Sequence, residues 1–117
     1  MPRPTKWRRV CDLPDNNRFG PLGSPAEPEN VVIMTVDEYE TIRLIDLERF
    51  TQEECADQMD ISRTTVQGIY SEARKKLAES LVNGKVLWIE GGEFLLCDGN
   101  GNGCGRGCRR HGRHGRP

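Results

Sequence analysis

Residues 51–71 read TQEECADQMDISRTTVQGIYS, and this stretch has the pattern of two short helices joined by a tight turn. Where two such helices cross at a fixed angle, apolar residues are needed at set positions, with a small residue at the contact. Asp60 suits the turn because Asp visits the left-handed region more readily than most residues. The residues that meet these requirements are Cys55, Ala56, Met59, Asp60, Ile61, Val66 and Ile69. We therefore predict a helix-turn-helix here.

Helix-start signals flank this unit, and Thr51 followed by Glu54 gives the same signal at its first helix. Thr35 followed by Glu38 is a capping box, and it predicts a helix running to about residue 48 or 49. Ser62 caps the helix that follows the turn, and Gly84 is placed to end it in the left-handed conformation. The β-branched run before Thr35, residues 31–34, predicts an extended segment that packs on the core.

Two apolar runs, residues 86–90 and 93–97, are joined by Gly91-Gly92, which predicts a tight β-hairpin. The expected fold class is therefore mainly α: a three-helix helix-turn-helix domain followed by a small β-hairpin, with flexible basic ends. Residues 1–30 are expected to be an irregular basic, Pro-rich arm, residues 31–97 the domain, and residues 98–117 a disordered tail rich in Gly, Arg, Cys and His. Because both faces of the hairpin are apolar, we expect a homodimer that buries Val86, Trp88 and Leu95, unless the amino-terminal segment covers them.

The net charge of −1 conceals a strong segregation of charge along the chain. Residues 1–20, 61–85 and 101–117 each carry five basic residues against at most two acids, and acidic blocks lie between them. Such a pattern suits a protein that shows a positive face to a polyanion. No apolar run reaches the ~20 residues of a membrane span, and no apolar stretch follows the basic amino terminus. We expect a cytoplasmic protein with no membrane partner.

The side chains on the outward face expected for the helix after Ser62 are short, polar or hydrogen-bonding. A merely solvated face would carry more Glu and Lys. Arg63 can bond guanine bidentately, Gln67 can bond adenine, and Gly68 would let a groove wall approach closely. The predicted DNA-binding residues are Ser62, Arg63, Thr64, Thr65, Gln67, Gly68, Ser71, Arg74 and Lys75. A basic arm of Arg3, Lys6, Arg8 and Arg9 is a candidate for a neighbouring minor groove, and its alternative is a flexible tail.

The stretches at residues 51–56, 61–66 and 73–77 resemble the helix-turn-helix of region four of bacterial sigma factors. Residues 1–97, including 3–4, 7–11, 17–19 and 42–46, are similar to a family of small uncharacterised prokaryotic proteins predicted to bind DNA. The resemblance implies a sigma-like helical fold and a transcriptional regulator that binds double-stranded DNA. It implies no regulon, and the other sigma-factor regions are missing.

The last residues hold a cluster of candidate metal ligands, Cys104, Cys108, His111 and His114, with Cys97 as a substitute for one histidine. Thiolates and imidazoles at this spacing suit zinc or an iron species. The alternative is an Arg-Gly tail that follows DNA phosphates. The odd number of cysteines, five, argues against a disulfide scaffold.

Two rival functions remain beside DNA binding. The tail favours a metal-responsive regulator or a metal-handling accessory protein, and the sigma-like helices would also suit a protein–protein adaptor. No required cofactor is expected. No set of nucleophile, base and orienting group stands out, so we expect no enzymatic activity.

Overall fold

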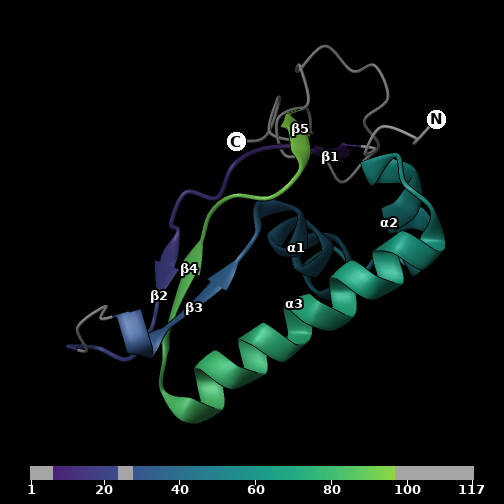
Figure 1. The fold of residues 1–117 in the computed structure, drawn as a ribbon. Coiled ribbons are helices and arrows are strands. Elements are labelled where there is room, and N and C mark those ends of the chain that lie inside the picture. The colour runs from purple at the N-terminus through teal and green to yellow at the C-terminus, as the bar shows by residue number, and fades with distance from the viewer. Residues whose placement is uncertain (1–6, 24–27, 97–117) are drawn as a thin grey trace, which may run out of the picture.

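The structure is a computed structural model that describes residues 7–23 and 28–96. Its elements are β1 (Arg8–Val10), β2 (Arg18–Phe19), the 3-10 helix η1 (Pro28–Asn30), β3 (Val31–Met34), α1 (Val36–Thr41), the π-helical η2 (Ile42–Leu47), α2 (Gln52–Met59), α3 (Arg63–Asn83), β4 (Val86–Ile89) and β5 (Phe94–Leu96). In Figure 1 the long helix α3 runs beneath the other elements, from α2 at one end to the sheet at the other.

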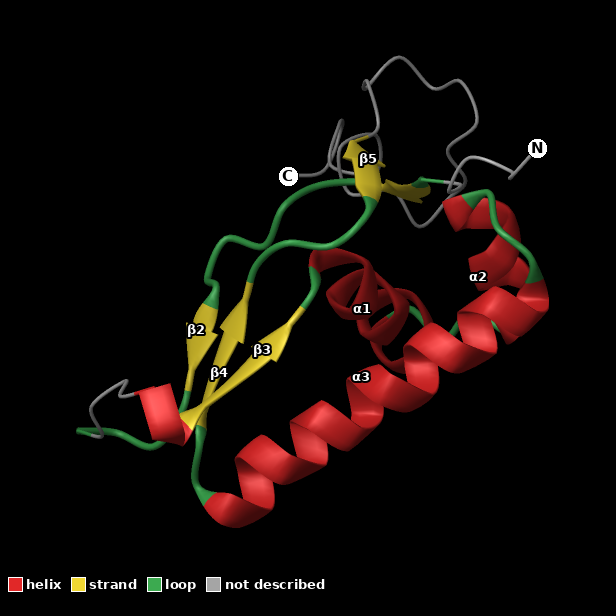
Figure 2. Cartoon of the chain, viewed as in Figure 1, coloured by secondary structure: helices red, strands yellow, loops and turns green. Residues whose placement is uncertain are grey.

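The strands form two small sheets in the described part of the chain. One has the order β2-β4-β3, in which β4 is antiparallel to β2 and parallel to β3, and the other pairs β1 with β5 in parallel. Figure 2 shows the three strands β2, β4 and β3 on one side of α1. The β1–β5 pair lies apart from them, above α1 in this view. The fold is therefore mixed α and β.

The predicted hairpin, and with it the mainly α fold class, is wrong. Although Gly91 and Gly92 have positive φ, the carbonyl of Gly91 accepts the Val36 N–H at 2.9 Å, which draws this turn over the start of α1. Strand β4 becomes the centre of a sheet, and β5 pairs with β1. Both faces of β4 are covered: Leu87 and Ile89 belong to an apolar core cluster, while Val86 is buried and Trp88 lies against the Arg18 guanidinium, which explains why residues 86–89 are apolar on both faces.

The amino-terminal end also differs from the prediction of a flexible arm, since residues 7–23 contribute β1 and β2. The guanidinium of Arg18 on β2 lies 4.1 Å from the centre of the Trp88 ring, and Val86 is buried. The apolar face on which a dimer was predicted is thus largely covered within the chain, although Leu95 stays exposed.

The helix-start signals are confirmed. Thr35 and Thr51 each form a reciprocal capping box, with Glu38 and Glu54. Ser62 caps α3, and Gly84 ends it at φ 67°. The run at residues 31–34 is β3, as predicted. The helix that starts after Thr35 changes at residue 42 into π-helical turns and ends before Glu48.

Helix α3 packs on two separate apolar clusters. Its first half meets a cluster from η2 and α2 (Leu44, Phe50, Cys55, Ala56, Met59, Ile61 and Val66). Its second half meets a cluster beneath the sheet (Val10, Val32, Met34, Val36, Ala73, Leu87 and Ile89). Within residues 7–23 and 28–96, none of the helices combines the length and apolarity that a bilayer crossing needs.

Candidate nucleic-acid interface

The turn between α2 and α3 is tight and fixed at both ends. Asp60 adopts φ 61° and ψ 45°, and the next residue, Ile61, is buried while its N–H donates to the carbonyl of Ala56 at 3.0 Å. Ser62 then accepts the Thr65 N–H at 3.1 Å. The left-handed residue and the apolar plug that follows it orient the start of α3 against α2, as the sequence predicted.

Seven of the nine predicted DNA-binding residues share one exposed face of α3. At 100° per residue, their side chains leave the helix within an arc of about 140°. These exposed residues are Arg63, Thr64, Gln67, Gly68, Ser71, Arg74 and Lys75. Between residues 63 and 75 the one carboxylate of α3, Glu72, lies about 40° outside this arc. We call these seven residues the reading face.

The remaining two predicted residues serve the helix end. The Ser62 hydroxyl accepts the Thr65 N–H and lies 2.8 Å from the Thr65 hydroxyl, which is half-buried. The side chains therefore satisfy the first turn of α3. The helix dipole by itself favours an anion at this end, but the nearby carboxylates of α2 oppose one.

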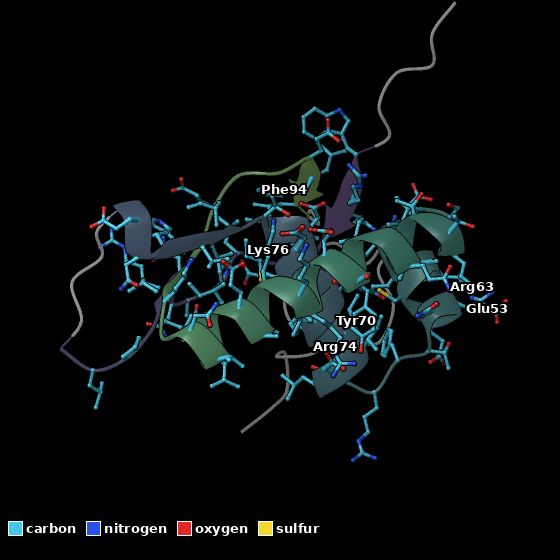
Figure 3. The ribbon with its side chains drawn as sticks, turned by 60° about the horizontal axis from the view of Figure 1, so that its bottom comes forward. Glu53, Arg63, Tyr70, Arg74, Lys76 and Phe94 are labelled. Carbon is cyan, nitrogen blue, oxygen red and sulfur yellow. The ribbon has the colours of Figure 1, made fainter. Side chains whose placement is uncertain are left out.

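Arg74 belongs to a small polar cluster on the side of α3 that faces η2. The Tyr70 hydroxyl donates to Asp46 Oδ1 at 2.8 Å, and Arg74 Nε lies 3.9 Å from Asp46 Oδ2. The Arg74 guanidinium also lies 5.4 Å from the centre of the Tyr70 ring. Burial of the hydroxyl, followed by its bond to Asp46, raises the pKa of Tyr70. Figure 3 shows Tyr70 and Arg74 together on one side of α3, with Lys76 on the other. Sequence reasoning missed Asp46, because nothing local links it to a residue 24 positions away.

A polar hollow of about 670 Å³ lies beside the reading face, between α2 and the start of α3. Its lining includes Arg63 together with the carboxylates Glu53, Glu54 and Asp57. In Figure 3 Glu53 and Arg63 lie near each other at this end of the molecule. These acids would repel a phosphate, so the backbone of a bound nucleic acid should avoid this hollow.

Arg8 and Arg9, two residues of the predicted arm, are engaged inside the fold. Arg8 Nη1 donates to Glu93 Oε1 at 2.6 Å. Arg9 donates to the carbonyls of Gln58 and Asp57 at 2.9 and 3.1 Å, which satisfies the carboxyl-terminal end of α2. Arg3 and Lys6 lie outside the described residues.

A buried ion pair between α1 and η2 is linked, through the residue that follows β1, to α2. Arg43 donates to both carboxylate oxygens of Glu40, at 3.0 and 2.9 Å, and Glu40 also accepts the Cys11 N–H at 3.2 Å. Gln58 of α2 donates to Cys11 Sγ at 3.1 Å. Burial would lower the pKa of Arg43, but the bond to Glu40 and its charge raise it. The network holds α2, and with it the turn before α3, against the rest of the fold.

The predicted metal ligands Cys97, Cys104, Cys108, His111 and His114 lie outside the described residues, so the zinc or iron site stays a prediction. In the part of the chain that the structure describes, no three His, Cys, Asp or Glu side chains are grouped to hold a metal ion. The two described cysteines, Cys11 and Cys55, are buried and form no disulfide.

Comparison with known proteins identifies a family whose description states no function. A family model described as "Protein of unknown function DUF134" matches residues 1–96. A UPF0251 protein of Desulfitobacterium hafniense strain Y51 is 74% identical over 113 residues, covering 97% of this chain and 90% of the relative. A UPF0251 protein of Caldanaerobacter subterraneus is 47% identical over 112 residues, covering 96% and 95%. A UPF0251 protein of Clostridium botulinum strain Hall is 49% identical over 99 residues, covering 83% of this chain and 63% of the relative. No solved structure matches the chain.

Proposed function

The chain belongs to the DUF134 family of UPF0251 proteins, and for this member we propose sequence-specific binding of double-stranded DNA in the regulation of transcription. The names of the relatives state no activity, so the proposal depends on the residues. In it, α2, the turn at Asp60 and α3 act as a helix-turn-helix, and the reading face enters the major groove.

The observation that carries the proposal is the composition and exposure of the reading face. Two arginines, a lysine, a glutamine, two hydroxyl residues and a glycine follow one another on the exposed side of a well-anchored helix. These are the side chains that bond base edges and phosphates in a major groove. An adaptor surface would instead be expected to offer apolar anchor residues there, and the reading face has none.

Different residues of the reading face have different roles in this proposal. Arg63 and Gln67 lie one helical turn apart near the start of α3, where side chains reach base edges. Arg74 and Lys75 lie further along the helix and would contact the phosphate backbone. Loss of a base contact lowers the affinity for duplexes that carry that base, whereas loss of a phosphate contact lowers the affinity for all duplexes alike.

The experiment first selects preferred duplexes from a random pool and then measures affinity by fluorescence anisotropy. Arg63→Ala and Gln67→Ala should each lose about 1–3 kcal/mol on the selected duplex, which is about 5- to 150-fold, and little on a scrambled one. Lys75→Ala should weaken both duplexes alike and reduce the salt dependence by about one phosphate contact.

The matched control is Asn83→Ala, which removes another exposed amide from the far end of the same helix and should leave DNA affinity unchanged. If no duplex is enriched, or if Arg63→Ala and Asn83→Ala behave alike, the proposal is wrong.

A further inference from the structure

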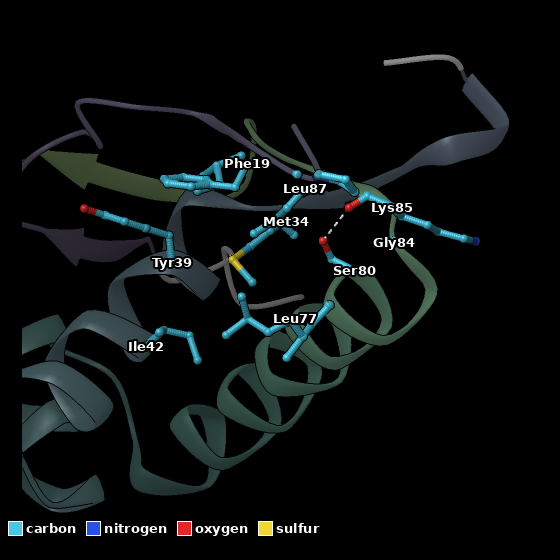
Figure 4. A pocket seen from close by; sticks show the side chains of 13 residues that line it. Phe19, Met34, Tyr39, Ile42, Leu77, Ser80, Gly84, Lys85 and Leu87 are labelled. Atoms are coloured by element: carbon cyan, nitrogen blue, oxygen red, sulfur yellow. Dashed lines mark hydrogen bonds between the residues drawn. The ribbon is translucent and has the colours of Figure 1, made fainter. Parts of the chain in front are cut away.

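The surroundings of α3 change along its length. Beneath its last turns lies an apolar groove of about 680 Å³, which Figure 4 shows between Leu77 and the sheet. The reading face lies nearer the start of the helix, is polar, and ends in the two cations Arg74 and Lys75. These cations have different neighbours, so they should not meet DNA in the same way.

The carboxylate of Asp46 is fixed beside Arg74 by a third residue. Its Oδ1 accepts the Tyr70 hydroxyl at 2.8 Å, and its Oδ2 lies 3.9 Å from Arg74 Nε. The Arg74 guanidinium also lies over the Tyr70 ring, 5.4 Å from its centre. Asp46 therefore cannot turn away from Arg74 without breaking its bond to Tyr70.

The ion pair between Arg74 and Asp46 is weak enough to be exchanged. The Arg74 side chain is 63% exposed and that of Asp46 is 37% exposed, so water screens both charges. A surface pair of this kind shifts an equilibrium by up to about fivefold. Lys75, in contrast, takes part in no ion pair with the described residues. Of the two cations, Arg74 alone must leave a carboxylate before it can bind another anion.

The position of Arg74 along α3 suits a DNA phosphate rather than a base. Arg74 follows Arg63 by eleven helical residues, which is about 16 Å along the axis. The major groove is about 12 Å wide. When Arg63 reaches a base edge, Arg74 therefore lies beyond the floor of the groove, beside the phosphate backbone.

We propose, on the basis of the function proposed above, that Asp46 is a positioning residue that competes with DNA phosphate for Arg74. In the free protein its carboxylate occupies the place at Arg74 that a phosphate takes in the complex. The phosphate can displace it, because a guanidinium binds phosphate through two parallel hydrogen bonds. The exchange lowers the affinity for DNA of any sequence, since the pair with Asp46 must be broken each time.

The test is the affinity of the purified full chain for the selected duplex and for a scrambled one, by fluorescence anisotropy at low salt. Asp46→Asn keeps an acceptor for the Tyr70 hydroxyl but removes the charge. It should bind both duplexes more tightly, by up to about fivefold. The matched control is Glu72→Gln, which removes an exposed carboxylate beyond the opposite edge of the reading face and should give a smaller gain. Circular dichroism should show the same fold and melting behaviour in both variants.

The dependence on Arg74 separates competition from a general effect of charge. In an Arg74→Ala background, Asp46→Asn should gain no more affinity than Glu72→Gln does, because the carboxylate then has no guanidinium to hold. The same gain from Asp46→Asn with and without Arg74 would overturn the inference. A loss of affinity in Asp46→Asn would overturn it too, since Asp46 would then assist Arg74 on DNA.

The two proposals fail in different ways. If a duplex is enriched but the gain in Asp46→Asn does not depend on Arg74, the proposed function stands and the competition is refuted. If no duplex is enriched, sequence-specific binding is refuted, whereas an Arg74-dependent gain on the scrambled duplex would still support the competition. A chain that binds no DNA at all would overturn both.

Discussion

Replacing Gly68 by Ala should make this protein more stable and a weaker DNA binder. Gly68 lies in the interior of α3 and is exposed, and a methyl group added there meets no atom of the protein within 4 Å. In a helix interior, Ala is favoured over Gly by about 0.8–1 kcal/mol. Since nothing in the fold opposes the methyl group, the full gain should appear and raise the melting temperature by about 4–8 °C.

On DNA the same methyl group should have the opposite effect. If the groove wall lies against the backbone of α3 at Gly68, a methyl group must push it away. A forced contact of this kind costs about 1–3 kcal/mol in a packed interface, which is about 5- to 150-fold in affinity. A stability gain and a binding loss from one substitution would be hard to attribute to anything but the position of Gly68 on the reading face.

The assays are thermal unfolding by circular dichroism and anisotropy on the selected duplex. The control is Ala78→Gly, an exposed position ten residues further along α3, which should lose about 1 kcal/mol of stability with DNA affinity unchanged. If Gly68→Ala gains stability and binds DNA as before, Gly68 does not face the groove and the orientation proposed for α3 is refuted.

Two further predictions concern the core. Glu40→Gln removes the buried carboxylate that pairs with Arg43 and should lower the free energy of unfolding in urea by about 3–5 kcal/mol. Glu48→Gln removes a partly exposed carboxylate 3.4 Å from Arg43 and should lower it by less than about 1 kcal/mol. Equal losses in the two variants would show that burial of the Glu40 pair does not set its contribution. Burial raises the pKa of Cys55 from 9.0 to about 12. Because the folded protein holds the neutral thiol more firmly than the unfolded chain does, this contribution is complete below pH 9 and is lost between pH 9 and 12. Between pH 9 and 12 the urea midpoint should therefore fall less steeply in Cys55→Ala than in the unmodified protein. The same pH dependence of the midpoint in both proteins would contradict this prediction.

The sequence by itself determined the local structure around the candidate site. Thr51 and Ser62 begin their helices, and Asp60 takes the left-handed conformation at the turn. Each of these features depends on hydrogen bonds and backbone preferences within about four residues. The apolar spacing of α2 and α3 likewise determined which side of α3 is buried, and therefore which residues form the reading face. These features could be predicted because the residues that produce each of them lie close together in the sequence.

Only the tertiary structure decided how the strands pair and what surrounds the ends of α3. Gly91-Gly92 is compatible with a hairpin and with a change of direction, and the choice depends on the Val36 N–H, more than fifty residues earlier. The contact between Asp46 and Tyr70 and the groove under Leu77 likewise join segments distant in the chain. Periodicity tells which face of an element seeks a partner but not which partner it finds, because several apolar segments compete for the same face. Their relative positions follow only when all of them pack at once.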